Sequence, residues 1–239
     1  MLLLLFILTN LFASFFQGIV GFGHGLIASP LSLTFLDKNT VLTSVMIIGT
    51  FLNLFLMLKI SEPLDKKIFF PLFTGSLIGM PFGILVLKLM PINTMRIVVG
   101  SLSIFFTFFI VFAKIKIHKI SYITPIIGLI CGVLQTSTGM PGPPVVILLS
   151  GSDVPKHSMR KILVSFFLYM TIITLPLFFI SRIMTMQGII YGICAIPFIF
   201  IAGFLGNKVA NIIPHRLYKA LTLITVCATG VFAIYSGLR

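Results

Sequence analysis

The chain alternates between long apolar runs and short polar or basic connections. Six runs are unbroken, at about residues 40–58, 68–90, 94–113, 158–180, 187–206 and 217–237. Each is close to the ~20 residues that a helix needs to cross the hydrocarbon core of a bilayer. The ~10-residue alternating segments of a membrane-spanning barrel are absent from the sequence, so helices remain as the way to satisfy the backbone in lipid. We therefore predict an all-α, polytopic integral membrane protein.

Two further apolar runs, residues 2–36 and 120–150, are interrupted by glycine and proline. When the second run is shifted back by 118 positions, Gln135 aligns with Gln17 and the two interruptions coincide. A weaker match at an offset of 123 relates the later spans. A duplicated broken membrane segment is typical of transporters built from inverted repeats.

Composition and charge support a membrane location. Of the 239 residues, 58% are hydrophobic and 9% are charged, whereas soluble domains have roughly 25% charged residues. The net charge of +13 comes from Lys and Arg that lie singly or in short clusters at the ends of the apolar runs. That placement is typical of residues that set membrane topology, so we expect the lipid bilayer, and no nucleic acid, as a partner.

Loop charges favour a hairpin at each broken run. If each run crosses once, the 17 Lys and Arg split almost evenly between the two sides. If each run doubles back, twelve lie on one side and five share the side of the N-terminus, namely Lys38, Lys88, Arg96, Arg182 and Arg239. The positive-inside rule then places both termini outside.

The hairpin interpretation divides the chain into two similar halves. Residues 1–114 and 119–239 would each form one membrane repeat, with a broken helical hairpin followed by three transmembrane helices. Because each half then has an odd number of crossings, tandem halves must be inverted relative to one another. Together they would form one transmembrane domain.

The two interruptions are the candidate binding site. Glycine permits positive φ angles and proline stops helices, so both strings should expose backbone N–H groups at membrane depth. Helix N-termini and glycine-rich turns offer partial positive charge, which makes an anion the natural ligand. The alternative interpretation is that the glycines only allow close helix packing. The predicted substrate-binding residues are Gln17, Gly21, Phe22, Gly23, His24, Gly25, Gln135, Thr136, Ser137, Thr138, Gly139 and Gly142.

His24 is the ionisable residue of these breaks. Protonated, it would add charge for an anion, and neutral, it would donate one hydrogen bond to the ligand or to a backbone carbonyl. The four acidic residues, Asp37, Glu62, Asp65 and Asp153, all fall in predicted loops. No intramembrane carboxylate is then available for proton or Na⁺ coupling. Unless His24 carries the proton, we expect passive or exchange transport.

Two smaller features complete the sequence inventory. Lys156 and Arg160 precede or begin a helix at the predicted inner edge, where they either set topology and contact lipid head groups or form an electropositive funnel for anions. Three cysteines lie inside apolar runs without CxxC spacing, so we expect buried free thiols, no metal site and no cofactor. They are Cys131, Cys194 and Cys227.

The breaks also resemble those of a known family. The strings Gly18-Ile-Val-Gly-Phe-Gly-His-Gly-Leu-Ile-Ala-Ser-Pro30 and Gly132-x6-Gly139-Met-Pro-Gly-Pro-Pro144 are similar to the paired signatures of the TauE/SafE sulfite exporter-like family, and the resemblance extends through essentially the whole chain. It implies a permease of the bacterial inner membrane that exports small sulfur-containing anions such as sulfite, thiosulfate or organosulfonates. His24 stands where the family commonly has another glycine.

Other functions are compatible with the same sequence. An anion permease working by alternating access is the first hypothesis, and an anion channel would use the same site. An intramembrane enzyme would need Ser137 or Ser29 as nucleophile and His24 as base, but no hydrolase motif accompanies them, so we do not expect an enzyme. A structural membrane subunit is a further alternative. A homodimer is compatible with the sequence, although we find no heptad or isolated GxxxG face outside the breaks that argues for one.

Overall fold

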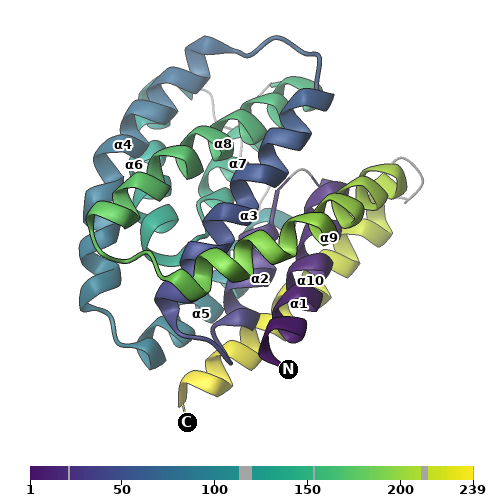
Figure 1. The fold of residues 1–239 in the computed structure, drawn as a ribbon. Coiled ribbons are helices and arrows are strands. Elements are labelled where there is room, and N and C mark those ends of the chain that lie inside the picture. The colour runs from purple at the N-terminus through teal and green to yellow at the C-terminus, as the bar shows by residue number, and fades with distance from the viewer. Residues whose placement is uncertain (21, 113–119, 153, 211–214, 239) are drawn as a thin grey trace.

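The computed structural model describes residues 1–20, 22–112, 120–152, 154–210 and 215–238, and the regular structure of these residues is entirely helical (Figure 1). The prediction of an all-α protein is confirmed. The helices are α1 (Leu2–Val20), α2 (His24–Ser32), α3 (Lys38–Lys59), α4 (Lys66–Leu89), α5 (Ile92–Phe112), α6 (Ile120–Thr138), α7 (Gly142–Ser150), α8 (Lys156–Ile180), α9 (Met186–Ala210) and α10 (His215–Leu238).

Six of the described helices are long and apolar enough to cross a bilayer, so the chain is a multi-pass membrane protein. These six are α1, α3, α4, α5, α8 and α9. In contrast, α2 and α7 have nine residues each, which is less than half of a crossing. Each of these short helices follows one of the breaks predicted from the sequence.

The helix bounds repeat along the chain. A shift of 118 residues carries Leu2–Val20 onto Ile120–Thr138, and His24–Ser32 onto Gly142–Ser150. The same shift carries the first residue of α3 onto the first residue of α8. The two five-helix halves therefore have the same element order. The predicted boundary between residues 114 and 119 lies outside the described residues, so the division into 1–114 and 119–239 stays a prediction.

Hydrogen bonds gather several chain segments at one end of the molecule, which we call the terminal end because both termini lie there (Figure 1). Arg96 Nε donates to the carbonyl of Leu33, at 2.7 Å, and Arg96 Nη1 donates to the carbonyl of Ser236, at 3.4 Å. Lys38 Nζ donates to the carbonyl of Leu87, at 2.6 Å. The exit of α2, the start of α3, the ends of α4 and α10 and the start of α5 therefore share this end.

The opposite end, which we call the basic end, joins the α3–α4 connection to the start of α8. Lys161 Nζ donates to the carbonyl of Ile60 at 2.8 Å. Since α1 starts at the terminal end and α2 exits there, the first broken run is a re-entrant hairpin and not a crossing. The second broken run is its inverted counterpart at the basic end: α6 runs parallel to α4, with Gly128 against Leu72 and Gly132 against Ser76, and α8 starts at the same end.

Two helix pairs hold the hairpins through glycine contacts. One face of α4 carries Gly75, Gly79 and Gly83, and the facing side of α6 carries Gly128 and Gly132. A methyl group on any of these five glycines would overlap a backbone atom of the other helix. The expectation of no GxxxG face outside the breaks was therefore wrong. Within the chain this stripe brings α4 and α6 into backbone contact, as small residues do in membranes.

The second pair, α1 with α9, repeats the first. A methyl group on Gly206 would overlap the carbonyl of Phe15 and approach Gly18, just as one on Gly83 would overlap the carbonyl of Val133 in the other half. Phe15 and Val133 are 118 residues apart. The match of Gly83 with Gly206 therefore corresponds to the same contact in both halves. Figure 1 shows the two pairs on opposite flanks, with α3 and α8 between them.

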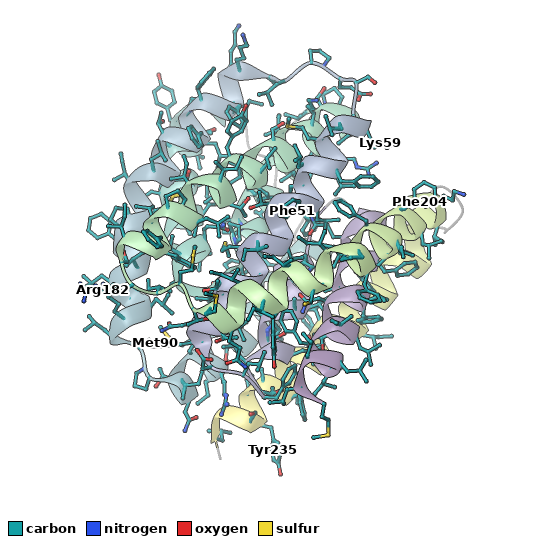
Figure 2. The ribbon with its side chains drawn as sticks, viewed as in Figure 1. Phe51, Lys59, Met90, Arg182, Phe204 and Tyr235 are labelled. Atoms are coloured by element: carbon teal, nitrogen blue, oxygen red, sulfur yellow. The ribbon has the colours of Figure 1, made fainter. Side chains whose placement is uncertain are left out.

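The outward surfaces are apolar, as lipid contact requires. Large exposed side chains follow α4, α5, α9 and α10, and Figure 2 shows Phe204 at the margin of α9. All three cysteines are free, as expected, but only Cys131 is buried. Cys194 is exposed on α9, because the apolar run that contains it turns one side to lipid and not to the core.

Two acidic residues predicted to lie in loops act as helix caps. Asp37 accepts hydrogen bonds from the backbone N–H groups of Asn39 and Thr40, at 3.0 and 2.9 Å, and Asp65 accepts from that of Lys67, at 3.0 Å. A carboxylate at an N-cap satisfies helix donors and complements the helix dipole. These two carboxylates therefore belong to helix starts at the two ends of the molecule.

The topology predicts which positions are accessible from each side of the membrane. In a background without the native cysteines, Leu2→Cys and Thr94→Cys should react with a membrane-impermeant maleimide from one side, and Ser61→Cys from the other. The positive-inside rule predicts that Leu2 and Thr94 face outside. Labelling of Leu2→Cys and Thr94→Cys from opposite sides would contradict the hairpin.

The glycine contact between α4 and α6 predicts a strong local sensitivity to side-chain size. Gly79→Leu should lower the stability of the purified protein by about 3 kcal/mol or more, since the side chain must push apart two backbones in contact. The matched control is Ile78→Leu, at the neighbouring position, which is 60% exposed. Melting curves in detergent measure both, and equal melting temperatures would contradict the tight contact.

Candidate functional site

Each break is built around a glycine in a left-handed conformation. Gly23 has φ of 103° and caps the N-terminus of α2, and Gly139 has φ of 74° directly after α6. Residues with a Cβ rarely adopt these angles, so glycine lets the chain reverse within one or two residues. The predicted role of glycine in the breaks is thereby confirmed at both positions. Gly21 lies outside the described residues.

The two breaks meet in direct backbone contact. A methyl group on Gly25 would overlap the carbonyl oxygen of Gly139. A methyl group on Gly142 would lie 3.6 Å from Cδ2 of Phe22 and 3.5 Å from Cζ of Phe167, which is ordinary packing. Gly25 is therefore the position where the contact between the two breaks leaves no room for a side chain.

A cavity of about 50 Å³ lies where the two breaks meet. It has room for a few water molecules or for one small polyatomic anion. Seven of the predicted site residues line it: Gln17, Gly23, His24, Gly25, Gln135, Gly139 and Gly142. Phe22 lies beside Gly142 but does not line the cavity.

The two glutamines occupy corresponding places in the two halves. Gln17 Nε2 donates to Oδ1 of Asn53, at 3.0 Å, and Asn53 Nδ2 donates to the carbonyl of Gly49, at 2.7 Å. Gln135 Nε2 contacts Sδ of Met46, at 2.9 Å. A thioether sulfur is a weak acceptor, so the amide of Gln135 can turn toward a better acceptor at little cost.

His24 is the first residue of α2 and is 4% exposed. His24 lines the cavity, and its Nε2 is buried and has no hydrogen-bond partner in the described part of the chain. A buried polar atom without a partner costs about 1–3 kcal/mol. Nε2 is therefore a group on which a ligand would gain a full hydrogen bond.

Three predicted residues are not brought to the cavity. The hydroxyl of Thr136 donates to the carbonyl of Met80 in α4, at 2.8 Å. Those of Ser137 and Thr138 donate to carbonyls one turn back in α6, at 2.6 and 2.8 Å. All three hydroxyl protons are thus used within the helix packing, and none of these residues lines the cavity.

The basic residues of the predicted inner mouth lie at the basic end, away from the cavity lining. Arg160 is half-buried and interacts electrostatically with Glu62, which connects the start of α8 to the α3–α4 connection. Lys161 reinforces the same connection through Ile60. The side chain of Lys156 lies outside the described residues, and the funnel remains a prediction.

Nine residues that line the cavity were not predicted from the sequence, and six of them come from α3 and α8. Gly49 and Asn53 on α3, and Phe167 and Thr171 on α8, line the cavity between the breaks. These pairs are related by the same shift of 118 residues. The sequence did contain a signal for Asn53. This residue is an amide inside an apolar run, and such residues mark functional sites in membranes. Among the described residues no group of three metal-ligating side chains occurs.

The contact between the breaks predicts that alanine substitutions at two glycines differ in their effect on stability. Gly25→Ala should lower the stability of the purified protein by about 1–3 kcal/mol and reduce ligand binding, because the breaks must separate. Gly142→Ala should leave the melting temperature close to wild type, since its methyl group meets only ordinary contacts. Thermal unfolding of both variants in detergent checks this, and an unchanged melting temperature for Gly25→Ala would contradict the contact.

Comparison with known proteins agrees with this architecture. A family model described as "Sulfite exporter TauE/SafE" matches residues 6–233, nearly the whole chain. Neither the curated proteins nor the solved structures contain a match. With a family match over this length, the chain belongs to the sulfite exporter TauE/SafE family.

Proposed function

We propose that this membrane transporter carries small sulfur-containing anions, such as sulfite, thiosulfate or organosulfonates, and binds them in the cavity between the two breaks. The single observation that carries the proposal is the meeting of two half-helix N-termini at one polar cavity. Broken helices that meet near the midplane are where transporters of this kind bind their substrates. The family description supplies the sulfur chemistry.

The donor groups of the cavity suit an anion. The first residues of a helix have N–H groups without intrahelical partners, and in α2 the first to bond back is Leu26, which donates to the carbonyl of Gly23 at 3.0 Å. In α7, Pro143 and Pro144 have no N–H, which leaves Gly142 as the donor nearest the break. An anion would therefore be held mainly by the first break, with the glutamine amides completing its shell.

Alternating access is supported by the inverted arrangement of the hairpins. The α1–α2 hairpin enters from the terminal end and the α6–α7 hairpin from the basic end, and they meet at Gly25 and Gly139. Movement of one hairpin, together with the helix of the other half on which it packs, would open the cavity to one side while the other hairpin closes the opposite side.

Polar groups continue from the cavity toward the terminal end. Asn10 Oδ1 and the hydroxyls of Ser14, Ser29 and Ser32 are buried in the first hairpin without a hydrogen-bond partner in the described residues. At the positions related to Asn10 and Ser14, the second hairpin has glycines that pack on α4. These unsatisfied groups support a path for a hydrated anion between α1 and α2 and the neighbouring helices.

Export of an anion needs no coupling ion. Moving one negative charge outward across an inside-negative potential of about 100 mV releases about 2.3 kcal/mol. The cavity lining has no carboxylate that would bind a proton or Na⁺. We accordingly propose uniport or exchange in the bacterial inner membrane, with both termini outside.

The enzyme and channel alternatives find less support. Ser137 is bonded within α6, and neither Ser29 Oγ nor His24 Nε2 has a hydrogen-bond partner among the described residues, so neither serine forms a nucleophile–base pair with the histidine there. A channel would need a continuous path, whereas the polar side chains that line the cavity are 5% exposed or less.

Counterflow of radiolabelled sulfite and thiosulfate in proteoliposomes tests the proposal. Wild-type protein should give saturable counterflow of at least one of them, and Gln135→Ala should reduce it about tenfold or more through loss of one ligand hydrogen bond. Thr138→Val is the matched control, because this hydroxyl is bonded within α6 and does not line the cavity. Linear, non-saturating flux would indicate a channel, and equal loss in both variants would remove the cavity as the site.

A further inference from the structure

The cavity has polar groups but no full charge. Residues 1–36 and 120–150, which contain both hairpins, include no Lys, Arg, Asp or Glu. The lining residues from α3 and α8 are also uncharged. Among the described side chains on helices packed against α2, the charged groups are Lys38, Lys59 and Arg96, and these lie at the ends of the molecule. A ligand must therefore be held by dipoles and neutral donors.

The two half-helices set the amount of positive potential. A helix N-terminus acts as up to about half of an elementary charge, so α2 and α7 together supply at most about one, and α7 supplies less than α2 because Pro143 and Pro144 have no N–H. Both helices have nine residues, enough for two full turns. Their N-terminal residues, His24 and Gly142, line the same cavity. The two helix ends therefore offer at most the equivalent of one positive charge to a bound ligand.

His24 is an independent sign that a ligand belongs here. It is 4% exposed, and its Nε2 lacks a partner in the described residues. An imidazolium at this place would face two positive helix ends without any carboxylate to pair with, so the ring is neutral in the unliganded site. A neutral imidazole donates one hydrogen bond from Nε2, or accepts one from a protonated oxyanion.

The charge of the ligand decides its desolvation cost. The cost of transferring an ion out of water rises with the square of its charge, so a dianion costs roughly four times as much as a monoanion of the same size. One equivalent of helix-dipole charge offsets the removal of a monoanion from water far better than that of a dianion. A buried site for dianions would need at least one Lys or Arg, and none is among the described residues that line this cavity.

We propose that the cavity selects singly charged sulfur oxyanions, namely hydrogen sulfite and alkanesulfonates, over doubly charged ones such as thiosulfate, sulfate and the sulfite dianion. This inference rests on the proposed function and narrows its substrate class. His24 determines the charge preference, because a neutral side chain there keeps the site at or below one equivalent of positive charge.

Competition in counterflow tests the charge preference on the wild-type protein alone. Counterflow of radiolabelled sulfite should be reduced by methanesulfonate at concentrations about tenfold or more below those needed with thiosulfate or sulfate. Sulfite counterflow should also rise as the pH is lowered through the neutral range, following the fraction of hydrogen sulfite. Equal or stronger competition by the dianions would overturn the proposal.

Two variants at position 24 distinguish titration of the protein from titration of the substrate. His24→Gln keeps a neutral donor and cannot titrate, so the pH dependence and the preference for methanesulfonate should persist. His24→Arg adds a full charge and should shift competition toward thiosulfate by about tenfold or more. Loss of the pH dependence in His24→Gln would assign it to the histidine and overturn the proposal. Loss of fold in His24→Arg would leave the wild-type competition result to decide.

The outcomes also separate this inference from the proposed function. Counterflow of sulfite with strong competition by dianions would keep the sulfur-anion transporter and reject the charge selectivity. Absence of counterflow with radiolabelled sulfite, thiosulfate and methanesulfonate alike, in protein with a normal melting curve, would reject the proposed function and with it the inference.

Discussion

The backbone contact between Gly25 and Gly139 is the constraint on which the rest of the structure depends. Two re-entrant hairpins enter from opposite ends, and they can meet only where neither chain carries a side chain. That meeting turns the two short helices so that both N-termini face one cavity. The positive ends of the helices, the glutamine amides and the free Nε2 of His24 are consequences of this geometry.

The glycine pairs that hold the hairpins follow the same principle at a larger scale. In lipid the association of helices depends on close packing, because lipid tails are as apolar as the side chains. The stripe of α4 against α6, and Gly206 of α9 against α1, bring backbones into contact on opposite flanks. Each re-entrant hairpin is thereby attached to a full crossing of the other half, and these two pairs would be the moving units of the proposed alternating-access mechanism.

The arrangement also explains why the proposed anion site needs no charged side chain. Under the proposed function, helix dipoles would supply positive potential without the desolvation penalty of a buried Lys or Arg, and an anion would then leave as readily as it enters. The basic residues are at the ends of the molecule, where Lys38 and Arg96 bond carbonyl oxygens at one end and Lys161 does so at the other. Charge therefore serves topology and the joining of helix ends, while the cavity remains neutral.

The sequence by itself determined the helical class, five of the six unbroken spans and the glycine positions of the breaks, because hydrophobic length and the backbone freedom of glycine are local properties. It also indicated Gln17, Gln135 and His24 as polar groups in apolar surroundings. Only the tertiary structure decided which polar groups share the cavity. Asn53 and Thr171 joined it from α3 and α8, whereas Thr136, Ser137 and Thr138 turned to backbone carbonyls. The direction of a side chain depends on which helix packs against it, and that contact joins segments far apart in the chain.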